Sequence, residues 1–391
     1  MKKHFVWKLL CSVLLILAVL VPTAVSTAGQ SISQKETHAP SVTAFAMSRS
    51  TATISPTSGA LAAYPCAERL SAEELQGMSL CAGGMPFGVK FYTDGVTVVG
   101  FCDVESETGK VNPAAEAGLK QKDVILKVNG EVLAGASQLT EMIENCGGNP
   151  LTLTCKRGND EFETTLKPVY CPAEARFKTG IWVRDSGAGI GTVTFIIPET
   201  GAFAGLGHGI CDADTGALIP MKRGSVSDVT ISSVVRGAAG APGELKGYFN
   251  AGKVGSLLGN GPCGVWGVFS ELPEEIGEPM PIGLRNELEE GDAYILSTLD
   301  SNKVEQYDVK ISNVNRDADG PKCFTVTVTD PDLLAVSGGI VQGMSGSPII
   351  QNGKIVGAVT HVLINDPTTG YGIFIENMLN TIHLPMAARV S

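Results

Sequence analysis

Short apolar runs separated by turn-forming residues fill the chain from about residue 171 to its C-terminus. Gly, Pro, Asn and Asp stand between these runs, and few stretches have the 3.6-residue period of a long helix. Such patterning is typical of sandwiches and barrels. We therefore predict a mainly β domain over residues 171–391, with material for two six-stranded barrels. The clearest runs are Thr192–Ile197, Asp228–Val235, Gln306–Val314 and Cys323–Asp330.

The pattern of residues 85–170 is different, because helical stretches alternate with short strands. Two apolar runs flank Asp94-Gly95, a dipeptide that predicts a tight hairpin. One short helix is expected to end at Gly118, and a second is expected where Leu139 and Ile143 share a face. The segment is therefore predicted to be a small α+β domain that precedes the β domain.

Four short motifs mark this α+β segment, at Pro113–Ala115, Ala117–Leu119, Asp123–Ile125 and Val128–Gly130. On these motifs the segment resembles a PDZ domain. The resemblance implies that it binds an extended peptide or C-terminal tail as an added strand, with the carboxylate held by backbone N–H groups. On that resemblance the peptide-binding loop is expected at Pro86, Phe87 and Gly88, and a spacer with a blocked groove is the alternative.

The N-terminal 64 residues have the features of an export signal and a linker. Three lysines precede the apolar segment Leu9–Val21, and small residues follow at Ser26–Gly29. This order indicates a signal peptide or membrane anchor over residues 1–28. Residues 29–64 are rich in Ser, Thr, Ala and Pro and are typical of a flexible linker. We expect an exported protein that associates with the membrane through its N-terminal segment.

Charge and composition exclude several classes of function. The net charge of -11 and the lack of a Lys and Arg cluster argue against binding to nucleic acid. No metal-binding motif is present, and Gly187–Gly191 lacks the spacing of a dinucleotide-binding loop, so no cofactor is expected. Nine cysteines outside the leader are scattered without the regular spacing of a disulfide framework.

A candidate nucleophile stands in the segment GGIVQGMSGSPIIQNGKIVGAVTH, which spans Gly338–His361. Gly343 and Gly346 flank Ser345, and Asn352-Gly353 then predicts a tight hairpin between apolar strands. A nucleophilic serine needs an exposed oxygen beside convergent backbone N–H groups. We expect the N–H groups of Gly343 and Ser345 to form that oxyanion hole.

The base that activates Ser345 is expected to be a histidine that precedes it in the chain. His208 lies between glycines in GAFAGLGHGICDADTG, in the first half of the β domain. His361 is the weaker alternative for this role. The order of His208 before Ser345 argues against an α/β-hydrolase, in which an acid and a histidine such as Asp366 and His383 would follow the serine.

These motifs resemble those of trypsin-like double-barrel serine endopeptidases, whose nucleophile lies in Gly-x-Ser-Gly-Gly-Pro. The order of leader, PDZ-like segment, GIWVRDSGAGIGTVTF, GHGICD and the serine segment is more closely similar to the stage IV sporulation protein B peptidases. This resemblance implies that Asp330 is the orienting acid of the triad, with Asp332 and Asp228 as open alternatives.

The same resemblance implies a function in spore formation. It predicts an exported signalling peptidase of the forespore intermembrane space that cleaves itself and a membrane-bound regulator of an intramembrane protease complex. A late mother-cell sigma factor is then activated. Self-cleavage is expected within or near the linker segment Gln30–Tyr64. The alternative is a catalytically inert PDZ scaffold of an envelope complex.

Overall fold

The structure is a computed structural model that describes residues 42–43, 70, 72–300 and 303–381. The expected leader and most of the expected linker lie outside these residues. Strands predominate, which confirms the prediction of a mainly β protein. Within the described residues no helix combines the length and the apolar character needed to cross a membrane.

The C-terminal part of the chain forms a closed antiparallel barrel in the order β19-β20-β21-β24-β23-β22. In β20, Tyr307, Val309 and Ile311 are buried while the residues between them face outward, as the alternating sequence predicts. Helix α5 precedes β22 and α6 follows β24. The bounds are β19 (Gly291–Ser297), β20 (Glu305–Ser312), β21 (Phe324–Val328), α5 (Pro331–Ser337), β22 (Pro348–Gln351), β23 (Lys354–Leu363), β24 (Asp366–Phe374) and α6 (Ile375–Thr381).

Six strands before this barrel form a second ring, because β3 pairs with both β12 and β14. The ring continues from β14 through β16, β17 and β13 back to β12. Aromatic residues fill it, among them Phe87, Phe91 and Phe203. The two rings confirm the double-barrel architecture. Their further bounds are β3 (Pro86–Phe101), β12 (Ile181–Ile197), β13 (Ala202–Gly205), β14 (Met221–Val235), β16 (Gly255–Gly261) and β17 (Gly264–Phe269).

Several short elements border the N-terminal barrel. Strand β15 pairs with β14 and also with the two residues of β1. Strand β2 pairs with β12 and β18. Their bounds are β1 (Val42–Thr43), α2 (Ala72–Gln76), β2 (Ser79–Ala82), β15 (Glu244–Phe249) and β18 (Pro279–Pro281).

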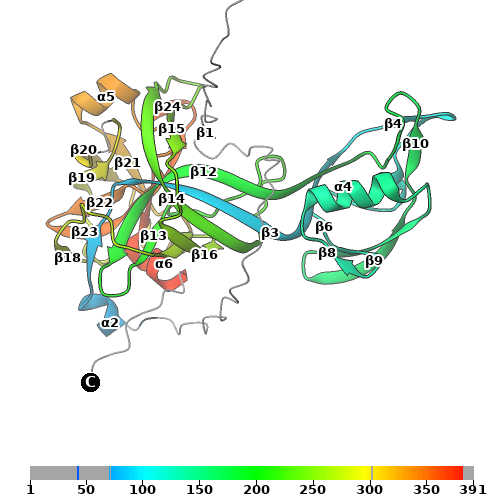
Figure 1. Ribbon diagram of the computed structural model, residues 1–391. Coiled ribbons are helices and arrows are strands. Elements are labelled where there is room, and N and C mark those ends of the chain that lie inside the picture. The colour runs from blue at the N-terminus through cyan, green and yellow to red at the C-terminus, as the bar shows by residue number, and fades with distance from the viewer. Residues whose placement is uncertain (1–41, 44–69, 71, 301–302, 382–391) are drawn as a thin grey trace, which may run out of the picture. The chain divides into compact units, whose positions relative to one another are not determined.

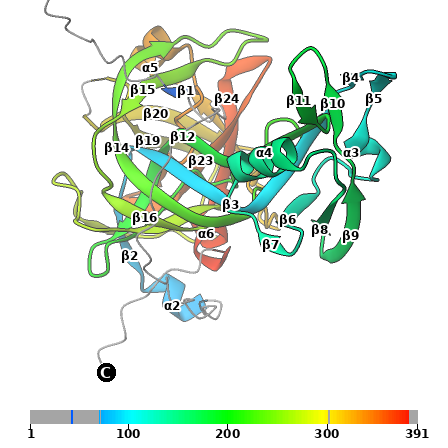
Figure 2. The ribbon, with the colours of Figure 1, turned by 45° about the vertical axis from the view of Figure 1, so that its right-hand side comes forward.

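The predicted hairpin at Asp94-Gly95 is wrong. Strand β3 continues through these residues and pairs along its length with β12, with a shift of register between Arg184 and Ser186 of β12 (Figures 1 and 2). Gly95 adopts a φ of 79° within this irregularity. A long partner strand from a distant part of the chain thus turns a local turn signal into a bulge.

A small α+β module lies between β3 and β12 in sequence. Its core includes Leu139 and Ile143 of α4, which confirms the predicted helix face. The barrel therefore starts with β3, before the module, and resumes with β12 after it. The module contains β4 (Val104–Ser106), β5 (Gly109–Val111), α3 (Pro113–Glu116), β6 (Val124–Val128), β7 (Glu131–Val132), α4 (Ala136–Asn145), β8 (Leu151–Arg157), β9 (Asp160–Leu166), β10 (Val169–Cys171) and β11 (Arg176–Lys178).

Candidate active site

Ser345 lies on the loop between α5 and β22, where its neighbours need the conformational freedom of glycine. Gly343 and Gly346 have φ angles of 100° and 99°. A β-carbon at position 346 would lie 2.0 Å from the carbonyl oxygen of Thr192, so only glycine fits there. The hydroxyl of Ser345 donates a hydrogen bond of 2.7 Å to the carbonyl oxygen of Thr360 on β23.

Two buried threonines of β12 hold the serine loop against the N-terminal barrel. The Thr192 hydroxyl donates to the Gly343 carbonyl at 2.7 Å, and the Thr192 backbone N–H donates to the Ser345 carbonyl at 3.0 Å. The Thr194 hydroxyl donates to the Gly346 carbonyl at 2.8 Å. Neither threonine was singled out from the sequence, although two hydroxyls at alternate positions of an otherwise apolar strand are a visible signal.

His208 lies on the loop after β13 and is tied to the same strand. The N–H of Leu206 donates to the Thr192 carbonyl, so Thr192 contacts both loops. Gly207 has a φ of 66°, and a β-carbon there would lie 2.8 Å from Cγ2 of Thr360. The residue before His208 therefore packs on the residue whose carbonyl accepts the Ser345 hydroxyl. The structure thus brings the His208 loop and the Ser345 loop together.

The imidazole of His208 has a defined tautomer in this arrangement. Its Nδ1 lies 2.9 Å from the carbonyl oxygen of Gly209. Because a carbonyl oxygen only accepts, we assign the proton to Nδ1, which leaves the lone pair on Nε2. Burial lowers the pKa of His208 below its ordinary value, although the bond to Gly209 opposes this shift. A neutral ring with its lone pair on Nε2 is the form that a general base needs.

The backbone donors expected for an oxyanion hole have no acceptor among the residues that the structure describes. Among the described residues, the N–H groups of Gly343 and Ser345 donate no hydrogen bond, whereas those of Met344 and Gly346 donate to Val341 and Val359. Buried N–H groups are rarely left without an acceptor. These two groups are therefore available to a substrate oxygen.

Comparison with protein families gives one match that covers more than half of the chain. The family model described as SpoIVB peptidase S55 matches residues 175–379, which include His208 and Ser345. The chain belongs to the SpoIVB peptidase family. It is accordingly a serine peptidase. No curated protein matches this chain.

The solved structures that match this chain include three of low sequence identity. The PDZ domain of an SdrC-like protein from Listeria monocytogenes is 21% identical, covers 23% of this chain and 87% of its own, and gives a TM-score of 0.19. The active form of the Rv3671c protease from M. tuberculosis is 16% identical, covers 50% of this chain and 71% of its own, and gives a TM-score of 0.28. Human heparin binding protein is 11% identical over 48% of this chain and 82% of its own, with a TM-score of 0.26.

The structure gives Asp330 of this peptidase a capping role. Its Oδ1 accepts the N–H groups of Asp332 and Leu333 at the start of α5, and its Oδ2 accepts the N–H of Asp308. Asp330 is half-buried, and among the described residues no carboxylate forms a hydrogen bond or ion pair with His208. The expected contact between Asp330 and His208 is therefore absent from this arrangement.

The two alternative acids, Asp332 and Asp228, likewise form no hydrogen bond or ion pair with His208. Asp332 is exposed in the first turn of α5, and Asp228 is exposed on β14 opposite Phe87. The sequence alone does not distinguish these roles, because the fourteen residues between Asp330 and Ser345 include a helix whose N-terminus a carboxylate stabilises equally well.

The peptide-binding loop of the PDZ module was placed wrongly at Pro86, Phe87 and Gly88. These residues belong to β3 in the N-terminal barrel, where they pair with β12 and β14. A β-carbon at Gly88 would lie 2.5 Å from the ring of Phe249. The motif residues fixed the domain type, but they did not show which strand borders its helix.

A groove suited to a peptide lies instead between α4 and the start of β12. A cavity of about 340 Å³ is lined there by Leu139 and Ile143 of α4 and by Gly180, Ile181 and Val183. Among the described strands, the first residues of β12 pair only with β3, so their other edge has no strand partner. An unpaired strand edge beside an apolar helix face is the arrangement in which PDZ domains add a peptide strand.

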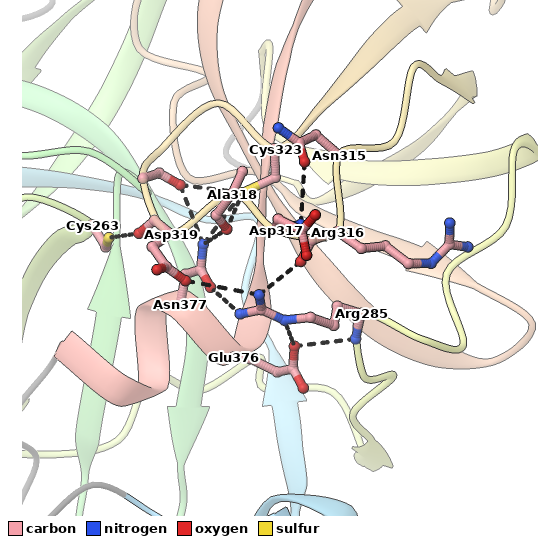
Figure 3. Close-up of polar contacts among 11 residues, drawn as sticks. Cys263, Arg285, Asn315, Arg316, Asp317, Ala318, Asp319, Cys323, Glu376 and Asn377 are labelled. Carbon is pink, nitrogen blue, oxygen red and sulfur yellow. Dashed lines mark hydrogen bonds and ion pairs between the residues drawn. The ribbon is translucent and has the colours of Figure 1, made fainter.

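A loop of the C-terminal barrel, residues 315–322, supports the strand that carries Thr360. Figure 3 shows how Arg285 and Asn377 fix this loop. Arg285 donates to the Arg316 carbonyl, to Glu376 and to the Asn377 side chain, and Asn377 donates to the Ala318 carbonyl at 2.9 Å. The Thr360 hydroxyl in turn donates to the carbonyl of Pro321 at 2.7 Å. Thr360, whose carbonyl oxygen accepts the Ser345 hydroxyl, is therefore anchored to the loop at residues 315–322 by its own hydroxyl.

Proposed function

We propose that this serine peptidase uses Ser345 as its nucleophile and His208 as its general base. The observation that carries the proposal is the meeting of their two loops on Thr192 and Thr360. On substrate binding the Ser345 hydroxyl turns from the Thr360 carbonyl toward Nε2 of His208.

The reaction then follows the acyl-enzyme route. Ser345 Oγ attacks the carbonyl carbon of the scissile peptide as Nε2 of His208 takes its proton. The N–H groups of Gly343 and Ser345 donate to the oxyanion. His208 passes the proton to the leaving amine, and water then hydrolyses the acyl-enzyme. Loss of one oxyanion donor typically costs about 100-fold to 1,000-fold in kcat. The assignment of Asp330 as orienting acid remains a prediction from the family resemblance.

The proposed biological role is that of a sporulation signal. The peptidase is exported, acts in the forespore intermembrane space, and cleaves a membrane-bound regulator of an intramembrane protease, so that a late mother-cell sigma factor is activated. Membership of the SpoIVB peptidase family supports this role. The groove between α4 and β12 supports a second part of the proposal, which is that the PDZ module holds a peptide or C-terminal tail of a partner.

Processing of the chain itself tests the proposal. We expect purified wild-type protein to shorten by cleavage within or near Gln30–Tyr64, while Ser345→Ala and His208→Ala remain long. Mass spectrometry of the products gives the new N-terminus. Identical shortening of all three proteins in a protease-free preparation would contradict self-cleavage and favour the inert scaffold. Dependence of the wild-type rate on protein concentration separates cleavage between molecules from cleavage within one.

A further inference from the structure

His361 stands on β23 directly after Thr360, the residue that accepts the Ser345 hydroxyl. Its ring centroid lies 4.7 Å from that of His208, with an angle of 39° between the ring planes. A single strand thus contacts both side chains of the proposed catalytic pair. The proposed reaction, as described above, gives His361 no chemical step.

The surroundings of His361 keep its ring neutral. Its Nδ1 is buried and has no hydrogen-bond partner among the described residues. Burial, the neighbouring His208 and the positive charge of Lys322 lower the pKa of His361 to about 4. These two groups, from the loop after β13 and from the loop at residues 315–322, are the titratable neighbours that act on it. His361 is therefore uncharged near neutral pH.

His208 needs a second restraint besides its tautomer. The Gly209 carbonyl fixes the proton on Nδ1, but one hydrogen bond leaves the imidazole free to tilt about that contact. In trypsin-like enzymes a carboxylate on Nδ1 provides both restraints. Among the described residues no carboxylate forms a hydrogen bond or ion pair with His208, whereas the ring of His361 packs against it with centroids 4.7 Å apart.

We propose that His361 is a positioning residue that holds the imidazole plane of His208 so that Nε2 faces Ser345. The proposal rests on the proposed function, since it concerns the same catalytic pair. Thr360 and the loop at residues 315–322 hold β23 in place for this role, through the bond from Thr360 to Pro321 and the Arg285 network in Figure 3.

Three substitutions at His361 distinguish the effect of a planar ring from the effect of side-chain bulk. His361→Phe keeps a planar ring of similar size, His361→Met keeps bulk without a plane, and His361→Ala removes both. We expect His361→Phe to hydrolyse a small acyl ester with a kcat within about threefold of wild type. His361→Met and His361→Ala should lose about 100-fold in kcat with KM nearly unchanged, because misplacement of a catalytic group by about 1 Å costs that much.

The pH dependence of kcat/KM distinguishes a positioning role from a merely structural one, because a loss of stability alone would not change it. Because burial lowers the pKa of His208, the kcat/KM of the wild type should fall on the acid side at a pH below the ordinary histidine pKa of about 6.5. His361→Ala admits water to His208, so this acid limb of the profile should shift upward toward about 6.5. His361→Phe should leave the limb in place. Val356→Ala, a buried substitution on the same strand, is the control, and it should lower thermal stability without moving the limb.

Two results would overturn the proposal. One is a kcat within about threefold of wild type for His361→Met or His361→Ala. The other is an equal loss in His361→Phe and His361→Ala while both melt near the wild-type temperature, which would make the nitrogen atoms, and not the ring plane, the needed feature. Ser345→Ala is measured alongside. If it hydrolyses the ester as fast as wild type, the proposed function itself is wrong, whatever the His361 variants do.

Discussion

Thr192 joins the loops of Ser345 and His208 through three of its atoms. Its hydroxyl and its N–H bind the serine loop, and its carbonyl binds the loop of His208. All of these groups are buried, with the residue only 1% exposed. A buried hydroxyl that satisfies a loop carbonyl is costly to remove, because the carbonyl is left without a donor.

We expect Thr192→Val to lower the free energy of unfolding by about 1–3 kcal/mol, since it leaves the Gly343 carbonyl unsatisfied. It should also lower kcat, because the same carbonyl belongs to the residue whose N–H is the proposed oxyanion donor. Urea unfolding and ester hydrolysis measure the two effects. Thr192→Ser keeps the hydroxyl and is the matched control. Unchanged stability and kcat in Thr192→Val would show that the hydroxyl does not support the loop.

Asp330 has a structural role at the start of α5 that can be tested separately from catalysis. Asp330→Ala should lower the free energy of unfolding by about 1 kcal/mol, whereas Asp330→Asn should retain the N-cap. Denaturant unfolding of the two variants checks this. An Asp330→Ala variant as stable as wild type would contradict the cap.

The activity of the same variants decides whether the carboxylate also takes part in catalysis. If Asp330→Asn keeps the wild-type kcat, the role of Asp330 is the cap. A fall of about 10⁴-fold with unchanged stability would identify it as the orienting acid in a conformation that differs from this one. The loops of His208 and Ser345, which the structure brings together, could be picked out from the sequence because glycines stand on both sides of each residue. The orienting carboxylate could not be predicted in this way, because an Asp in a turn has no comparable sequence pattern around it.

Among the arrangements of helices and strands, the groove between α4 and the start of β12 is the one most relevant to partner binding. Thr140 is exposed and lines the groove, whereas Glu141 is exposed on the same helix but does not line it. Thr140→Trp should fill the groove and slow cleavage of protein substrates, while hydrolysis of a small ester stays unchanged. Glu141→Trp is the control. Equal effects of both variants on protein cleavage would contradict a role for the groove.

Helices and strands were predicted well where short-range sequence patterns determine them, and poorly where pairing with a strand far away in the sequence determines them. The buried face of α4 and the hairpin at Asn352-Gly353 follow from short-range patterns and are present. The turn expected at Asp94-Gly95 is overridden by β12, which lies some ninety residues later in the chain and pairs with β3 on both sides of it. The peptide groove was misplaced for the same reason, because its strand edge belongs to β12.

At the scale of the whole molecule, the N-terminal barrel is interrupted in sequence by the PDZ module. The strands before and after it, β3 and β12, are 16 and 17 residues long and are paired. The sequence showed both fold types but placed the boundary between them at residue 171. The barrel in fact begins with β3, before the module. The sequence does not reveal this, because β3 pairs only with strands that come later in the chain.

An ion pair links β12 to the loop that follows His208. Arg184 of β12 contacts Asp212 at 2.6 Å and Asp214 at 3.0 Å, and Asp212 is only 4% exposed. Burial alone would raise the pKa of Asp212, but hydrogen bonds from Thr215 and Arg184 outweigh it and lower the pKa. The pair therefore stabilises the fold above the ordinary pKa of Asp212, and this contribution is lost as the pH falls through the lowered value.

We expect Arg184→Met to cost about 3–5 kcal/mol of unfolding free energy near neutral pH, because it leaves a buried carboxylate without its partner. The double variant Arg184→Met with Asp212→Asn should recover part of this loss. A double-mutant cycle by urea unfolding measures the coupling. A coupling energy near zero would contradict a stabilising role for the pair.

The central claim is that Ser345 is a nucleophile activated by His208. The most direct measurement is the labelling of purified protein with a fluorophosphonate probe, followed by mass spectrometry of the modified peptide. The account predicts one modified residue, Ser345, in wild type, and loss of labelling in both Ser345→Ala and His208→Ala. No labelling of folded wild-type protein, labelling at another residue, or equal labelling of His208→Ala would contradict it.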